Sequence, residues 1–490
     1  MKKKTATDMT QGNLLKQIFW FTVPLILGNI FQLTYNTVDT IVVGRFAGNE
    51  ALAAVGTCDP VMSLLILGVS GICVGASVLM SNFLGAGRDE ELKREFQTTI
   101  SMGMIFAFVV LVAGLAVTNL ILRMLQTPQE IMRDSAVYLR VIFIGMPFTC
   151  LYNIYAAGLR SIGDSSTPVK YLILSCLINI GCDILFVAGF GWGVFGAGAA
   201  TVLAQAVSAV LCVVYVSRNV PLLHFESRTD GVSSEVRETQ KDSEKFNPSE
   251  KGDLEIYEKR KKKKRAFFRN IFGKWRPHID RDLALKTITY GGFSALQQCT
   301  QPIGKLFIQG TVNALDSVAT IAAFNAIGKI EDIGLLPGRS ISDSIMTFVA
   351  QNEGAGQKER GEKGFRQGIL LEVISGILVS LVVYLFMDPL LHLFTTEAQI
   401  IEEGRSYFLI MAFAYWIPCI MNGHQGYFRG IGAMKTVFLG TFTQITIRVI
   451  TTMLLVPRMG VAGVGIACIA GWCAHGSWAI PYRIWRSSRH

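Results

Sequence analysis

Long apolar stretches separated by short polar ones dominate the chain from residue 15 onward. Each stretch reaches the roughly 18–20 residues that a helix needs to cross a hydrocarbon layer about 30 Å thick. The pattern predicts an all-α polytopic membrane protein with about twelve transmembrane helices. The expected spans are 15–43, 54–82, 96–120, 136–158, 168–190, 194–217, 284–312, 317–349, 367–388, 404–428, 434–457 and 461–484.

The composition supports this prediction. Of 490 residues, 51% are hydrophobic and 17% charged, and the mean hydropathy is +0.41. A soluble domain has about 25% charged residues, so a soluble enzyme is excluded. The first apolar segment, 18–43, is too long for a cleaved signal peptide, and we expect it to be retained. The ten cysteines form no C-x-x-C pair, which indicates no metal or disulfide site.

Basic residues alternate from one side of the predicted membrane to the other. Lys and Arg cluster in the loops around 88–94, 160–170, 358–366 and 429–435. The loops 190–193 and 389–403 contain neither residue. By the positive-inside rule, both termini are cytoplasmic in a plasma membrane protein. The net charge of +10 lies mainly in these loops, so it does not indicate nucleic-acid binding.

The two halves of the chain repeat each other. The Gly-Ala-Gly triplet at 85–87 returns at 354–356, and the stretch 160–163 matches 429–432 with the same offset. A constant register over more than about a hundred residues indicates duplication. An even number of helices per half makes the repeats parallel, with a cleft between two six-helix lobes. We therefore expect an N-terminal lobe, 1–217, and a C-terminal lobe, 283–490.

The segment that joins the lobes, 218–282, is polar and highly charged. Its basic run at 261–265 is followed by apolar residues that share one helical face, up to Trp275. Such a segment is typical of an amphipathic helix on an anionic membrane surface. The alternative is a solvated cytoplasmic linker whose basic run only sets the topology.

An ionisable side chain within a membrane span is energetically costly and often functional. Asp39 lies in the first span, at the end of a polar stripe along one helical face. Pro24 removes a backbone hydrogen bond in the same helix, so we expect a bend there. The stripe, which we consider a candidate wall of a substrate cavity, consists of Asn29, Gln32, Asn36 and Asp39, with Tyr35 beside it.

The fifth span carries Asn179 and Asp183, four residues apart on one face, and Thr201 follows in the sixth span. A carboxylate shielded from water takes up a proton readily, and a second carboxylate nearby strengthens this effect. Together with Asp39, these residues can hold a proton, or Na⁺ through their oxygen atoms. The structural alternative is that they only form hydrogen bonds between helices.

The second half contains bases as well as acids within its spans. Two hypotheses follow: a buried ion-pair network, for example Lys305 with Glu331 or Asp332, or a site for an anionic or zwitterionic cargo. Arg448 occupies the repeat position of Asn179. The candidate residues in this half are Gln297, Gln301, Lys305, Gln309, Glu331, Asp332, Arg339, Asp343, His424 and Arg448.

No motif for ATP binding or hydrolytic catalysis is present: G-x-x-x-x-G-K-[ST], H-E-x-x-H and G-x-S-x-G are all absent. We therefore expect a non-enzymatic carrier without cofactors. Its energy source would be an ion gradient, worth about 2.3 kcal/mol per charge per 100 mV.

The chain resembles the multidrug and toxic compound extrusion (MATE) family, particularly its DinF-like branch. The resemblance rests on PLILGN at 24–29, VDTIVVGR at 38–45, ALAAVG at 51–56 and the paired Gly-Ala-Gly loops. It implies a V-shaped, monomeric exporter of small, often cationic organic compounds, driven by H⁺ or Na⁺ antiport. It also implies a first-lobe cation site made of Asp39, Asn179, Asp183 and Thr201.

The NorM-like branch of this family has key acids in the seventh and tenth helices. This chain has Gln297 and Gln298 in the seventh and no acid in the core of the tenth. The positive charges of Lys305 and Arg448 are also poorly suited to binding a lipophilic cation. The alternatives are a flippase for lipid-linked precursors with a basic central cavity, and a ligand-binding sensor.

Overall fold

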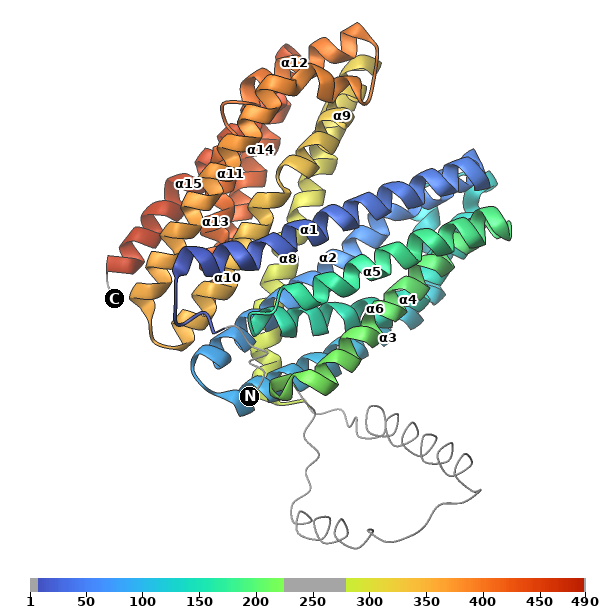
Figure 1. Cartoon of the computed structure of the whole chain (residues 1–490). Coiled ribbons are helices and arrows are strands. Elements are labelled where there is room, and N and C mark those ends of the chain that lie inside the picture. Colours follow the sequence, from blue (N-terminus) through green and yellow to red (C-terminus); the bar gives the residue numbers. More distant parts are fainter. Residues whose placement is uncertain (1–7, 224–278, 489–490) are drawn as a thin grey trace, which may run out of the picture.

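The computed structural model describes residues 8–223 and 279–488, and this part of the chain is helical throughout its regular structure. The proposed amphipathic helix at 261–275 lies outside the described residues. The helices form two lobes that touch at one end and diverge at the other, so the molecule is V-shaped (Figure 1). The all-α, two-lobe prediction is confirmed.

The N-terminal lobe contains six long helices, two of which continue into a short π-helix. A residue inserted into the i→i−4 ladder, as in a π-helix, is common at functional sites. The elements are α1 (Leu14–Val42), η1 (Val43–Ala47), α2 (Asn49–Gly85), α3 (Asp89–Met124), α4 (Gln129–Ser161), α5 (Ser166–Asp183), η2 (Ile184–Gly189), α6 (Gly193–Asn219) and the 3₁₀ turn η3 (Pro221–Leu223).

The C-terminal lobe has eight helices because two of its spans are broken. Between α12 and α13 the axis bends by 58°, and α9 passes into α10 at Leu335. The helices are α8 (Arg281–Asn313), α9 (Val318–Gly334), α10 (Leu336–Gly354), α11 (Lys358–His392), α12 (Ala398–Met411), α13 (Trp416–Gly430), α14 (Met434–Met459) and α15 (Val461–Ser488).

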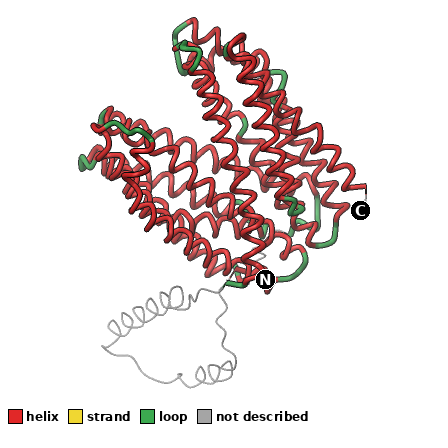
Figure 2. Tube along the Cα trace, turned by 180° about the vertical axis from the view of Figure 1, so that it is seen from behind, coloured by secondary structure: helices red, strands yellow, loops and turns green. Residues whose placement is uncertain are grey.

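These helices correspond to the twelve expected spans. Among the described residues, nine helices are long and apolar enough to cross a membrane, and the bent α12–α13 pair makes up to ten. The other two spans are α8, which is rich in glutamine, and the broken α9–α10. Both contain polar side chains near the other lobe, which lowers their hydropathy. Figure 2 shows the same helical arrangement from behind.

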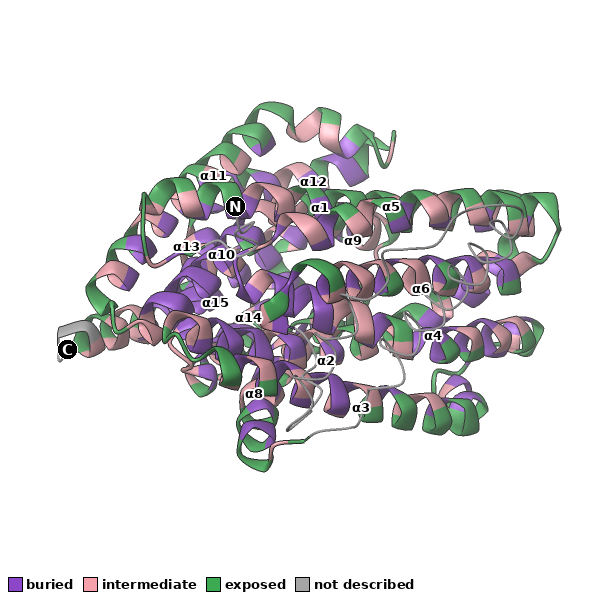
Figure 3. Ribbon diagram, turned by 60° about the horizontal axis from the view of Figure 1, so that its bottom comes forward, coloured by how far each residue is buried: buried purple, intermediate pink, exposed green. Residues whose placement is uncertain are grey.

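Many large apolar side chains are exposed on both lobes, and each lobe also has its own apolar core. Buried and exposed residues alternate along most of the helices (Figure 3). Phe108, Leu306 and Leu454 are among the many large apolar residues that are exposed. A soluble protein rarely exposes such continuous apolar surface. This surface is suited to contact with lipid.

Two glycines related by the repeat allow the lobes to meet at the closed end. Gly85 ends α2 and Gly354 ends α10, 269 positions later. A Cβ at Gly85 would overlap the carbonyl oxygen of Gln351, and one at Gly354 would overlap that of Asn82. Only glycine permits this approach of two backbones. The Gly-Ala-Gly loops found in the sequence therefore form the joint of the V.

The segment before α1 also connects the lobes at this end. The Met9 N–H donates to Oε1 of Gln351 at 3.0 Å, and the Gln351 amide donates to the Ser161 carbonyl at 2.8 Å. Arg360 of α11 donates to the Met9 carbonyl at 3.3 Å. These contacts hold the closed end together while the open end has no equivalent brace among the described residues.

Candidate cation site and inter-lobe network

Two carboxylates meet in the outer half of the N-terminal lobe, where regular helix gives way to π-helix. Asp39 lies one turn before the α1–η1 transition, and Asp183 is the last residue of α5, directly before η2. Their carboxyl groups lie close enough to interact with each other electrostatically. The Asp183 side chain is completely buried, and Asp39 is half-buried.

Asn179 and Thr201 complete the group that the sequence predicted. With its amide oriented to satisfy both neighbours, Asn179 donates to Oδ2 of Asp183 at 3.0 Å and accepts from the Thr201 N–H at 3.3 Å. The structure thus brings all four residues together. Thr201 contributes its backbone in this contact, whereas the sequence suggested its hydroxyl.

No base neutralises this acid pair. Among the described residues, neither Asp39 nor Asp183 forms an ion pair with Lys, Arg or His, and Oδ1 of each is buried without a hydrogen-bond donor. Unpaired carboxylate oxygens in a dry site attract a proton or a small hard cation. The site therefore has the chemistry of a cation site.

A cavity of about 160 Å³ lies beside the acid pair, between α1, α4, α5 and α6. Asn179 lies in its wall and also donates to Asp183, so the pair is one side chain away from the cavity. Its polar lining is Asn29, Gln32, Tyr35, Thr149, Tyr152, Asn153, Arg160, Ser175, Asn179, Thr201, Gln205 and Ser208.

The structure differs from two predictions for α1. Asn36 is exposed and takes no part in lining this cavity, although Gln32 and Tyr35 on the same helix do. The helix also runs without interruption through Pro24, from Leu14 to Val42. In this state the irregularity of α1 lies at η1 beyond Asp39, and a bend at Pro24 stays a prediction for another state.

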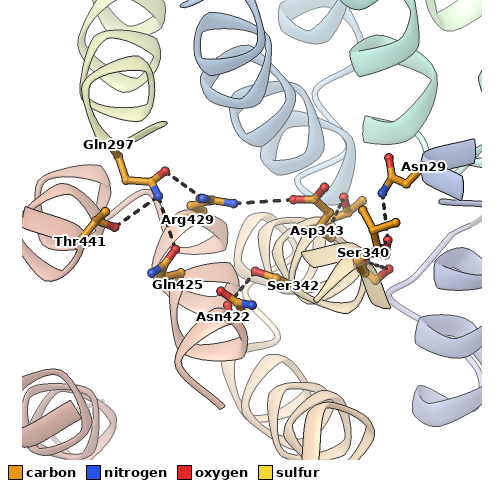
Figure 4. A network of polar contacts seen from close by, with 12 residues as sticks. Asn29, Gln297, Ser340, Ser342, Asp343, Asn422, Gln425, Arg429 and Thr441 are labelled. Carbon is orange, nitrogen blue, oxygen red and sulfur yellow. Dashed lines mark hydrogen bonds and ion pairs between the residues drawn. The ribbon is translucent and has the colours of Figure 1, made fainter. Parts of the chain in front are cut away.

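Where the lobes meet, a polar network includes several residues of the second half (Figure 4). Arg429 lies between Gln297, which accepts its hydrogen bond at 2.8 Å, and Asp343, whose Oδ1 is 3.6 Å away. Gln297 in turn donates to Thr441 at 3.2 Å. Across the joint, Asn29 donates to Ser340 at 3.1 Å. The predicted residue Gln297 thus contributes to an inter-helix network.

Lys305 and Arg339 share one acidic partner, Asp332, in exposed pairs, whereas the sequence suggested a buried network in which Lys305 would pair with Glu331 or Asp332. Lys305 is 3.9 Å and Arg339 3.8 Å from Asp332, and the basic side chains remain 60% and 57% exposed. Such long, exposed pairs contribute little to stability. Gln301 is also exposed on α8. These side chains are therefore accessible on the surface of the C-terminal lobe.

Arg448 and His424 are held inside the C-terminal lobe. Arg448 lies close enough to Glu331 for strong electrostatic attraction, and Glu331 accepts hydrogen bonds from Tyr407 at 2.6 Å and Tyr415 at 3.2 Å. His424 is buried, with Nδ1 2.9 Å from the Ile420 carbonyl. Arg448 and Glu331 thus form a network of the kind the sequence suggested, without a direct ion pair.

The sequence profile of the MatE family matches the chain twice, over residues 24–185 and 294–454. The chain belongs to the MatE family. The two matches fall on the two lobes and agree with the internal repeat. Members of the MatE family are transporters and not enzymes, so the prediction of a multi-pass, non-enzymatic carrier is confirmed.

The MatE relatives include multidrug transporters of similar length. The chain is 28% identical to the probable multidrug resistance protein YoeA of Bacillus subtilis (strain 168), covering 81% of this chain and 76% of the relative. It is 24% identical to an FAD transporter of Shewanella oneidensis, covering 80% and 77%. A solved structure of an outward-facing MATE multidrug resistance transporter superposes with a TM-score of 0.82 at 20% identity, over 98% and 97% of the two chains.

Sequence reasoning missed several buried polar residues of this MatE protein. Tyr407 and Tyr415 donate to Glu331, and aromatic residues in apolar spans gave no signal of that role. Glu372 lies inside the predicted span 367–388 and is fully buried in α11. The sequence signal for Glu372 is an ionisable residue inside an apolar span, which is costly unless it has a function.

Proposed function

We propose that this MatE protein exports small organic compounds in exchange for H⁺ or Na⁺ bound at Asp39 and Asp183. The observation that supports this most strongly is a pair of neighbouring carboxyl groups, beside a polar cavity, that has no basic partner among the described residues. An isolated structural acid in a membrane lobe normally has a basic partner. The grouping of these residues with Asn179 and Thr201 favours the DinF-like branch.

The proposed cycle starts from the state described here, with the lobes apart at one end. Because the closed end carries the basic loops, the positive-inside rule places that end in the cytoplasm, and the open end faces outward. This orientation places both termini in the cytoplasm and treats 218–282 as a cytoplasmic linker of a monomeric plasma membrane protein.

Cation binding removes the repulsion between Asp39 and Asp183. The outer half of α1 can then pack closer to α5, with Pro24 and η1 as the points where the backbone yields. That movement narrows the cavity lined by Gln32 and Tyr35 and displaces cargo outward. When the lobes close outside and open inside, the cation dissociates toward the lower cytoplasmic concentration.

The charge of the cargo has two candidates. A relative named as a probable multidrug resistance protein favours a drug-like cargo, which the family resemblance implies is often cationic. Lys305 and Arg339, more than half exposed on the C-terminal lobe, favour an anionic or zwitterionic group, and one relative carries the dianionic cofactor FAD as cargo by its name. A flippase for lipid-linked precursors would use the same basic side chains.

The test is transport in proteoliposomes with an imposed H⁺ or Na⁺ gradient. A cationic dye, a flavin nucleotide and a fluorescent lipid-linked precursor are offered separately to the wild type and to Glu359→Gln, an exposed control on α11. Gradient-driven movement of either soluble compound supports the antiporter. Movement of the lipid alone, or transport that ignores both gradients, contradicts it.

A further inference from the structure

A second acid is buried in the C-terminal lobe, far along the chain from the cation site. Glu372 lies in the middle of α11 with none of its surface exposed. Neither carboxyl oxygen has a hydrogen-bond partner among the described protein groups. A charged carboxylate in such a place costs several kcal/mol. The geometry therefore requires a neutral, protonated side chain in this state.

The surroundings of Glu372 are built to accommodate the carboxyl group. A Cβ at Gly338 of α10 would lie 3.0 Å from Oε2 of Glu372, 3.3 Å from the Cys419 sulfur and 3.5 Å from Nδ2 of Asn422. The side-chain ends of Glu372, Cys419 and Asn422 thus lie next to the backbone of α10 at Gly338. A Cβ at Gly423 of α13 would lie 3.4 Å from Cγ of Glu372, so this glycine also leaves room for the Glu372 side chain.

Charged groups near Glu372 are few, and one of them reaches the space between the lobes. Among the residues that the structure describes, Asp343 on α10 and Cys419 on α13 are titratable groups close enough to interact with it electrostatically. The Asp343 side chain is 45% exposed and also faces Arg429, 3.6 Å away (Figure 4). Asp343 is thus partly exposed and also close enough to influence the buried acid electrostatically.

The helices that enclose Glu372 are interrupted beside it. The α9–α10 break at Leu335 is three residues from Gly338, and α13 begins at Trp416, three residues before Cys419, after the 58° bend. The N-terminal acids lie beside η1 and η2 in a comparable way. A shift at these breaks changes the contacts of the buried carboxyl directly, because its neighbours are the first turns after each break.

We propose that Glu372 is a second proton-binding residue, which exchanges its proton with the inter-lobe opening through Asp343 as α10 and α13 move. The proton leaves the Glu372 carboxyl as H⁺, passes to the Asp343 carboxylate and then to water, so no bond other than O–H is broken. The N-terminal acid pair and Glu372 would then be loaded independently, one in each lobe.

Infrared difference spectroscopy of the lipid-reconstituted full chain tests this proposal without transport. We expect a carbonyl band of a protonated carboxylic acid in the wild type that disappears at high pH. It should be absent in Glu372→Gln and retained in the control Glu359→Gln. Asp343→Asn should keep the band but slow its response to a pH jump. A Glu372 band that does not respond to pH identifies a fixed structural acid and overturns the proposal.

A second readout uses the proposed antiport, on which this part of the inference depends. In a pH-gradient assay, Glu372→Gln should still transport a cationic dye, with the H⁺-to-dye ratio lowered by about one, the single proton that a carboxyl holds. An unchanged ratio contradicts the proposal. The infrared band in an Asp39→Asn, Asp183→Asn double variant separates the two ideas, because it should persist even if the first-lobe coupling is wrong.

Discussion

In the N-terminal lobe an acid pair lies without a base, whereas the C-terminal lobe surrounds its equivalent region with compensating groups. Arg448 stands where the first repeat has Asn179, and Thr452 stands where it has Asp183. Tyr407 matches Tyr138, but only Tyr407 donates to an acid, Glu331. Both lobes use the same helices, so the contrast comes from a few side chains.

This contrast indicates how a duplicated fold divides its tasks. A polar cluster that contains its own base, such as the one around Glu331, has no need of an external cation and can remain fixed during transport. An acid pair without a base, such as Asp39 and Asp183, remains incomplete until an ion arrives, and its packing can follow ion binding. The following predictions test this division, from the largest expected effect to the smallest.

Removing either acid of the N-terminal pair should have the largest effect. Asp39→Asn and Asp183→Asn should each reduce gradient-driven transport to the level of protein-free liposomes, because the ion loses one of the two carboxylates that bind it. Glu331→Gln, which removes a buried acid of the other lobe, should retain coupled transport. The measurement is dye movement under an imposed gradient, with folding checked by size-exclusion profile. Gradient-driven transport that survives in Asp39→Asn would contradict the proposed difference between the two lobes.

Removing a tyrosine hydroxyl should destabilise the protein more in the C-terminal lobe than in the N-terminal lobe. Tyr407→Phe deletes a 2.6 Å hydrogen bond to Glu331 and should cost about 1.5–3 kcal/mol, the range for bonds to charged groups. Tyr138→Phe removes no hydrogen bond of this kind and should cost less than about 1 kcal/mol. Thermal unfolding in the same detergent compares the two. Equal losses would show that the C-terminal cluster is no more self-contained than the N-terminal one.

A methyl group at the joint tests the part that both lobes share. Gly85→Ala forces α2 away from the Gln351 carbonyl and should cost about 1–3 kcal/mol, as overpacking does. Gly354→Ala should match it, since the two glycines are related by the repeat. The control is Gly56→Ala on α2, where the added Cβ meets nothing within 4 Å and should be neutral or slightly stabilising. The readout is again the unfolding temperature.

The smallest effect is expected at exposed pairs. Lys363 lies 2.7 Å from Glu359 on the first turns of α11, with both side chains largely in solvent. Lys363→Ala should leave the unfolding temperature and transport unchanged, because water screens such a pair. A clear loss in either assay would indicate a role for the α11 surface that the comparison of lobes does not include.

The sequence predicted most of the architecture because membrane spans and repeats leave strong one-dimensional patterns. The twelve spans, the offset between the halves and the residues Asp39, Asn179 and Asp183 were all visible as periodicity or as costly charges. Contacts across helices were not visible. The sequence did not indicate that Arg429 would bridge Gln297 and Asp343.

Helix irregularity was also hard to predict. The π-helices after Asp39 and Asp183 involve no proline at the point of change. The break at Leu335 is followed by Pro337 in the first turn of α10, and this proline was not among the residues where we predicted a bend. Pro24, where the sequence predicted a bend, lies in an unbroken helix. Backbone breaks of this kind depend on how neighbouring helices pack, which a single sequence does not record.

The central claim is that the acid pair of the N-terminal lobe binds the coupling cation, and cation uptake by the purified protein tests it most directly. Proton uptake after a pH jump and Na⁺ binding by calorimetry are compared between the wild type and the Asp39→Asn, Asp183→Asn double variant. We predict that the wild type binds about one more cation per chain than the double variant, since one shared site is removed. Equal uptake by the two proteins would contradict the account.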